Sequence, residues 1–339
     1  MKTKWIILTA VLQVMVLVFM AGEREWVLRT GRTLYLRTVP VDPRDAMRGD
    51  YVSLSYDISR VPRDLWRGRL AGTDLSMLPA DTVVYAALNL SDNLVAELVG
   101  LDLDPPLSGC FIRGRMERQW WRGNNNMINV RYGIEAFFTQ QGRAEEIERN
   151  RRQGSLQIPL EMEVAIGSGG MAVLKGYRKC DLGIKLDLEV PHANTHGKTK
   201  RSTGAVISLV NLSSNSLAVI DSLQALALLP DTTQWNENVK WNWKSTPVRD
   251  PLRVVLLPPG QTHQIKISFS DPFWSVFKTE NGKSEPPTIL TNITNDWMAR
   301  FRFEYRPPDK QQCANLTNST QIWHGKLTSP VFSPPSAEN

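Results

Sequence analysis

The sequence predicts a mainly β protein carried on a single N-terminal transmembrane helix. An uncharged, apolar segment covers residues 5–22, close to the start of the chain. From residue 33 onward, short runs place hydrophobic residues at every second position, and Gly, Asn, Asp and Pro separate these runs. The chain of 339 residues is 42% hydrophobic and 22% charged, which excludes wholesale disorder and a polytopic membrane protein.

The charges around the apolar segment predict its orientation. Lys2 and Lys4 precede it, whereas the acidic Glu23 follows it. Positive charge before a membrane segment favours a cytoplasmic N-terminus. The segment is about 26 Å long as a helix, slightly short of a hydrocarbon core of about 30 Å. We therefore expect a protein of the cell membrane that crosses once, with its ectodomain outside the cytoplasm, which is the periplasm in a Gram-negative host.

We interpret residues 1–22 as an uncleaved signal anchor. Ala21 and Gly22 are small enough for a signal-peptide cleavage site, but Phe19 and Met20 do not fit the usual pattern of small residues. A cleaved signal peptide and a buried core helix remain the alternatives.

Residues 23–190 are predicted to form the first β-rich domain. Residues 142–153 are acidic early and basic late, as a helix favours, and a second short helical piece is expected over 59–66. The predicted strands of this domain cover residues 33–39, 51–56, 83–88, 94–98, 110–116, 127–132, 160–166 and 172–174.

A polar segment of small residues, 191–203, is expected to link this domain to a second one over 204–328. About seven short strands with regular turns are typical of an immunoglobulin-like β-sandwich. They are expected over residues 205–210, 217–220, 223–229, 252–257, 264–269, 299–305 and 321–325. The tryptophans of this domain are expected to pack in its core, with a carbohydrate-stacking platform as the alternative. The proline-rich tail 329–339 is expected to be disordered.

The composition also limits the chemistry. A net charge of +6, spread along the chain, gives no basic stripe for nucleic acid. No histidine precedes His192, which excludes a histidine-based triad from the first domain, and the pair His192 and His196 lies in a loop context that does not favour metal binding. We therefore expect no cofactor, no metal and no nucleic-acid partner.

The disulfide state of Cys110, Cys180 and Cys313 stays open between a Cys110–Cys180 bridge and three free thiols.

Three segments of the first domain carry a resemblance. Residues 49–56 read GDYVSLSY, residues 132–138 read YGIEAFF, and residues 171–176 read MAVLKG. Over roughly residues 1–185 the chain resembles the bacterial GDYXXLXY family. The resemblance implies a membrane-anchored envelope protein beside a polytopic membrane protein, and it implies no established activity. We interpret the first domain as a barrel-like, β-rich GDYXXLXY domain with one helix.

The motif has two interpretations. In the first, Gly49 and Asp50 form a turn that leads into a strand, and nearby arginines pair with acidic residues around it. In the second, the motif builds a binding site for a partner. The candidate binding residues are Arg48, Gly49, Asp50, Tyr51, Leu54, Tyr56 and Glu135.

These observations favour a non-enzymatic interaction or accessory module that docks a membrane or envelope partner, in particular a polytopic membrane protein. The alternative is a hydrolase or peptidase-like enzyme of the envelope. No residue stands out as catalytic, because no nucleophile, base and orienting group occur together in a recognised pattern.

Overall fold

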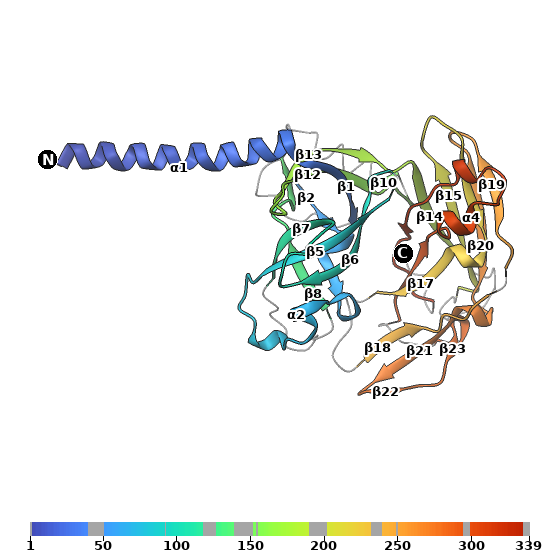
Figure 1. The fold of residues 1–339 in the computed structure, drawn as a ribbon. Coiled ribbons are helices and arrows are strands. Elements are labelled where there is room, and N and C mark those ends of the chain that lie inside the picture. Colours follow the sequence, from blue (N-terminus) through green and yellow to red (C-terminus); the bar gives the residue numbers. More distant parts are fainter. Residues whose placement is uncertain are drawn as a thin grey trace. The chain divides into compact units, whose positions relative to one another are not determined.

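The computed structural model describes residues 2–39, 51–91, 93–117, 127–138, 152–153, 155–189, 202–231, 239–248, 250–293 and 299–334. The chain divides into two compact units (Figure 1). The first consists of Met1–Glu148 and Pro159–Lys179, and the second of Arg149–Ile158 and Cys180–Asn339. Both are mainly β, as predicted.

The helices and strands of the first unit follow the predicted order. Their bounds are α1 Lys2–Thr30, β1 Arg32–Val39, β2 Tyr51–Ser53, β3 Ser55–Tyr56, η1 Asp57–Ser59, β4 Arg60–Pro62, η2 Arg63–Leu65, α2 Gly68–Ala71, η3 Leu75–Met77, β5 Val83–Leu90, β6 Ala96–Asp102, β7 Cys110–Met116, β8 Met127–Arg131, β9 Ala136–Phe138, β12 Leu160–Ile166 and β13 Ala172–Lys179.

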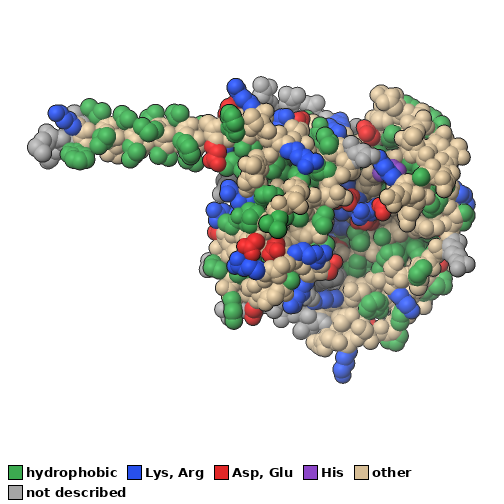
Figure 2. Space-filling model, in the orientation of Figure 1, with side chains coloured by type: hydrophobic (Ala, Val, Ile, Leu, Met, Phe, Trp, Pro, Cys, Tyr) green, Lys and Arg blue, Asp and Glu red, His purple; other side chains and the backbone are tan. Residues whose placement is uncertain are grey.

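Helix α1 runs without interruption from Lys2 to Thr30. It is long and apolar enough to cross a membrane, a property that a signal sequence shares. Its apolar side chains are exposed over residues 5–20, and Figure 2 shows hydrophobic side chains along its length. Val27, in contrast, is buried. The predicted apolar helix is therefore confirmed, and it continues beyond Gly22 into the folded part of the first unit.

The strands of the first unit form a nearly closed, barrel-like sheet. Five antiparallel strands lie in the order β4-β8-β7-β5-β6. Strand β1 pairs with β12 and, at its end, with β3, which leads through η1 into β4. Strand β1 also approaches β6 at the other end of this order, because the Tyr35 amide donates to the carbonyl oxygen of Leu94, just before β6, at 2.9 Å. Alternating side chains such as Leu34, Val84 and Ile112 fill the interior.

Two helical expectations are wrong in part. Arg152–Gln153 is strand β10, not the end of a helix, because it pairs with Leu156–Gln157 across a tight connection. The remainder of the predicted helix, 142–151, lies outside the described residues. Residues 59–66 form β4 between two short 3₁₀ turns, since Val61 is fully buried opposite Ile128 in the sheet.

The second unit contains more strands than the sequence predicted. Its elements are β10 Arg152–Gln153, β11 Leu156–Gln157, β14 Leu182–Glu189, β15 Gly204–Asn211, β16 Leu217–Asp221, η4 Leu223–Ala225, β17 Leu226–Pro230, β18 Val239–Trp243, β19 Arg253–Leu257, β20 Thr262–Ser268, η6 Pro272–Trp274, β21 Ser275–Glu280, β22 Lys283–Ser284, β23 Thr288–Ile289, η7 Leu290–Asn292, β24 Phe301–Tyr305, α4 Lys310–Cys313, η8 Ser319–Gln321 and β25 Leu327–Thr328.

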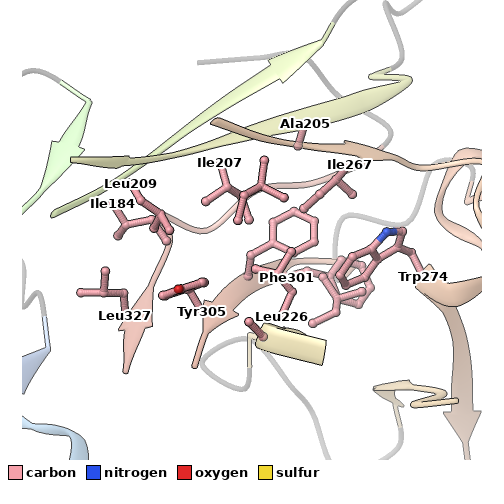
Figure 3. Packing of buried hydrophobic residues seen from close by; sticks show 14 of the residues in the cluster. Ile184, Ala205, Ile207, Leu209, Leu226, Ile267, Trp274, Phe301, Tyr305 and Leu327 are labelled. Atoms are coloured by element: carbon pink, nitrogen blue, oxygen red, sulfur yellow. The ribbon is translucent and has the colours of Figure 1, made fainter. Parts of the chain in front are cut away.

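One core joins the sheets of this unit. Figure 3 shows Ile207 on β15 and Ile267 on β20 facing Phe301 and Tyr305 on β24 across it. The five-stranded sheet β10-β11-β14-β15-β20 and the three-stranded sheet β17-β24-β25 supply these side chains. The immunoglobulin-like form of this unit stays a prediction. A strand over 321–325 is not formed, because only Ile322 makes a bridge there, to Ala218.

The division between the units differs from the sequence-based boundary at residue 190. Strand β14 pairs with β15 along its whole length, from Leu182 opposite Asn211 to Glu189 opposite Gly204. The segment expected to link two domains therefore connects two neighbouring strands of one sheet. Its last residue, Thr203, donates its amide to the carbonyl oxygen of Glu189 at 2.9 Å.

The start of the expected disordered tail is part of the core. Phe332 is buried and stacks on Phe303, with ring centroids 4.9 Å apart. It also exchanges two backbone hydrogen bonds of 2.9 Å with Phe301. Residues 335–339 lie outside the described residues. Order therefore extends at least to this contact.

The cysteines and the described tryptophans have packing roles. Cys110, Cys180 and Cys313 are free thiols. Within the described part of the second unit, three tryptophans are buried, and Trp243 stacks on one of them. The buried ones are Trp241, Trp274 and Trp323. This arrangement agrees with core packing and leaves these three rings unavailable for stacking on a sugar.

Candidate functional site

The second half of the GDYVSLSY motif lies against the YGIE segment. Strand β2 pairs with β9, with Tyr51 opposite Phe138 and Ser53 opposite Ala136. The Leu54 amide continues the contact by donating to the carbonyl oxygen of Glu135 at 2.8 Å. The structure thus brings together two segments that lie about 80 residues apart in the sequence. Arg48, Gly49 and Asp50 lie outside the described residues, and of Tyr51 only the backbone is described.

Tyr56 is the last residue of the motif, and it is buried. Its hydroxyl donates to the carbonyl oxygen of Ile134 at 2.7 Å. Burial, and secondarily the negative charge of Glu135, raise the pKa of Tyr56 well above its ordinary value. Leu54 is buried as well. Both side chains therefore support the motif from inside the barrel and do not lie on its surface.

Tyr132 makes the matching bond in the opposite direction. Its hydroxyl donates to the carbonyl oxygen of Ile58 at 2.8 Å, just after the motif. Burial raises the pKa of Tyr132 well above its ordinary value, and the charges of Glu135 and Asp57 act in the same direction. Neither tyrosine is thus suited to act as a phenolate nucleophile or base near neutral pH.

Glu135 holds the turn between β8 and β9. Its Oε1 accepts the amide of Tyr132 at 2.5 Å, and its Oε2 accepts the amide of Gly133 at 2.9 Å. Gly133 has a φ of 79°, a backbone conformation that residues with a Cβ adopt only at a cost in free energy. The half-buried carboxylate therefore satisfies two amides of a tight turn with both of its oxygens.

A buried charge cluster on the same unit was missed by the sequence analysis. Glu161 on β12 is buried and lies between two arginines, with Oε1 3.3 Å from Nη2 of Arg37 and Oε2 2.7 Å from Nε of Arg178. The guanidinium of Arg178 also lies 3.6 Å from the ring centroid of Tyr35. Alternation in β1 and β12 places these charges on the sheet face opposite the core leucines, but only the pairing of the strands shows that they meet.

The described residues contain no cluster of three or more His, Cys, Asp or Glu side chains arranged for a metal ion. His192 and His196 lie outside the described residues. Ser275 and Lys278, whose spacing resembles a serine–lysine dyad, both lie on strand β21, where residues three apart point to opposite faces. That spacing therefore does not build a dyad.

The family comparison agrees with the motif geometry. Residues 13–176 match the family described as GDYXXLXY protein. No match was found among curated proteins or among solved structures. The matched region contains both motif segments and ends three residues before the first unit does, at Lys179. Residues 13–176 of this chain therefore belong to the GDYXXLXY protein family.

Proposed function

We propose that this protein is a single-pass membrane protein that docks a membrane or envelope partner and catalyses no reaction. In this proposal the N-terminus lies in the cytoplasm and the folded units lie outside it, in the periplasm of a Gram-negative host. The first unit makes the contact, and a polytopic membrane protein is the favoured partner.

The form of α1 supports an uncleaved anchor. The helix passes without a break through Ala21 and Gly22, where a signal peptidase would need an extended segment. Its last turns belong to the fold, because Val27 is buried and its Cγ2 would lie 2.9 Å from a Cβ at Gly167, in the turn between β12 and β13. Exposed apolar side chains over residues 5–20 are costly in water and suited to a bilayer.

The motif geometry carries the proposal of a docking module. The hydroxyl of Tyr56 and both carboxylate oxygens of Glu135 bind backbone groups, and Leu54 is buried. These residues position β2 on β9, and the side-chain oxygens of Tyr56 and Glu135 are all engaged by backbone groups. Such a rigid support favours a surface that is presented to a partner over a reaction centre. Direct contact through Arg48, Gly49, Asp50 and Tyr51 stays a prediction.

Purification of the full-length protein from its native membranes in a mild detergent, followed by mass spectrometry, tests the proposal. We expect a polytopic membrane protein in a stoichiometric amount. A second form of the chain, with residues 1–22 replaced by an unrelated single-span helix, should retain this companion if the first unit makes the contact.

Two results would contradict the proposal. A protein that is recovered alone from both purifications has no stable partner. Turnover of ester or peptide substrates by that isolated protein would instead support the envelope hydrolase.

A further inference from the structure

A cavity of about 500 Å³ lies at the base of α1, within the first unit. The last turns of α1 form one wall, the turn between β12 and β13 forms a second, and the start of β7 forms a third. Its lining includes Trp26, Arg32, Cys110, Arg113 and Ser168. We call it the membrane-proximal cavity. Its volume lies in the range of sites that bind small molecules, about 300–1,000 Å³.

Close backbone packing builds these walls. A Cβ at Gly167 would lie 2.9 Å from Cγ2 of Val27, so this glycine lets α1 approach the β12–β13 turn. Gly170, with a φ of 77°, accepts the amide of Arg113 at 2.8 Å and ties the same turn to β7. A Cβ at Gly170 would lie 2.7 Å from the ring of Phe111. The walls of this half-open cavity are therefore formed by elements that are packed against one another.

Two arginines in the lining have no partner among the residues that the structure describes. Arg32, at the start of β1, and Arg113, on β7, are exposed, and neither guanidinium makes an ion pair or hydrogen bond there. Other arginines of the first unit are paired, for example Arg131 with Asp81 at 2.7 Å. Glu23 is the carboxylate in the described lining. The cavity thus carries excess positive charge that is suited to an anion.

The position along α1 places one wall of the cavity at the depth of lipid headgroups. The uncharged run ends at Gly22, and the α1 residues that line the cavity begin at Glu23. At about 1.5 Å per residue, the turn from Glu23 to Val27 lies within about 8 Å of the hydrocarbon edge, which is the extent of the headgroup layer. Trp26 lines the cavity and is 70% exposed, and tryptophan is enriched at this depth.

We propose that the membrane-proximal cavity binds the headgroup of a membrane phospholipid. Arg32 and Arg113 hold the phosphodiester, because a guanidinium donates two parallel hydrogen bonds to phosphate oxygens. Trp26 lies beside the glycerol and the upper acyl chains. This inference rests on the membrane anchor of the proposed function, and it adds a lipid ligand to the docking role.

Lipid retention gives the first test. The full-length protein is reconstituted in phosphatidylglycerol nanodiscs, released into a phosphate-free detergent, and its bound phospholipid is counted by native mass spectrometry. We expect retained phospholipid on the wild type and on the control variant Arg60→Gln, an exposed arginine that does not line the cavity. The double variant Arg32→Gln/Arg113→Gln should retain at most about one tenth of the phospholipid bound by the wild type, because its charge-assisted contacts with the phosphate are lost.

Cys110 provides a second, independent measurement. This free thiol is half-buried and lines the cavity, so an occupant should shield it from a thiol-alkylating reagent. The alkylation of Cys110, followed by peptide mass spectrometry, is compared in phosphate-free detergent, in detergent with inorganic phosphate, and in phospholipid nanodiscs. We expect protection only in the nanodiscs, and loss of this protection in the double variant.

Each other outcome is informative. If inorganic phosphate protects Cys110 as well as the nanodiscs do, and no phospholipid is retained, the ligand is a soluble phosphate anion and the proposal is overturned. Absence of both retention and protection in a protein that resists alkaline carbonate extraction would overturn it while leaving the anchor intact. Release of the protein by carbonate would contradict the anchor itself.

Discussion

Tyr56 and Tyr132 cross-connect two distant segments of the barrel by reciprocal hydrogen bonds. The hydroxyl of Tyr56 donates to the carbonyl oxygen of Ile134, beside Tyr132 in the chain, while the hydroxyl of Tyr132 donates to the carbonyl oxygen of Ile58, beside Tyr56. Each tyrosine thus satisfies a buried backbone group in the segment that carries the other. The final tyrosine of GDYVSLSY has an architectural role in this geometry.

Removal of either hydroxyl should destabilise the first unit. Tyr56→Phe and Tyr132→Phe each leave a buried carbonyl without its donor, and we expect a loss of about 1–3 kcal/mol in the free energy of unfolding. Chemical denaturation of the full chain in detergent, followed by tryptophan fluorescence, measures this loss. The control Tyr85→Phe should change little, since Tyr85 packs on Phe111 and has no hydroxyl partner in the described residues. Equal effects at all three positions would contradict the role of the hydrogen bonds.

Stability should fall at alkaline pH. Burial raises the pKa values of Tyr56, Tyr132 and Tyr305 above the ordinary value of about 10. Above pH ~10 the unfolded chain releases these phenolic protons while the folded chain keeps them, so rising pH favours unfolding. Unfolding midpoints measured across this pH range should therefore decrease, and Tyr132→Phe should reduce the slope. A slope unchanged by this substitution would show that other groups cause the loss.

Glu135→Ala should loosen the turn between β8 and β9. The substitution leaves the amides of Tyr132 and Gly133 without their acceptor, and we expect a loss of about 1–3 kcal/mol. Hydrogen exchange measured by mass spectrometry should speed up in peptides that contain this turn. The matched control is Glu163→Ala, whose half-exposed carboxylate pairs with Lys175 at 3.2 Å and should cost about 0–1 kcal/mol. Unchanged hydrogen exchange at the turn would contradict the role of Glu135 in holding it.

The buried charge cluster should be sensitive to loss of its carboxylate. Glu161→Gln leaves the buried Arg37 facing Arg178 without the intervening negative charge, and breaking a buried pair costs about 3–5 kcal/mol. The expected result is a strongly lowered denaturation midpoint. Lys175→Gln, at a more exposed pair on the same sheet, serves as the comparison. If both variants unfold alike, the cluster contributes no more than a surface pair.

Several strands were predictable because a strand with one buried face places hydrophobic residues at every second position of the sequence. Residues 110–116 and 160–166 alternate in the sequence, and β7 and β12 have these bounds. The apolar helix was predictable from composition and length alone. The motif spacing also identified the family that residues 13–176 match.

Other features depended on which distant residues pair. A polar segment around residue 195 has the same composition whether it links two domains or two strands of one sheet. Only the pairing of β14 with β15 shows that it connects two strands. Residues 152–153 favour a helix by composition, yet pairing with β11 makes them a strand. Local propensity is weak beside the backbone hydrogen bonds and burial that a sheet supplies.

The sequence by itself therefore determined the N-terminal apolar helix, the β class, the positions of many strands and the family. Only the tertiary structure decided that Tyr56 and Leu54 point inward, that Glu135 holds a turn, and that Arg32 and Arg113 line one cavity. The physical reason is that alternation specifies which face a residue occupies, whereas contacts between faces depend on strands that are far apart in the chain.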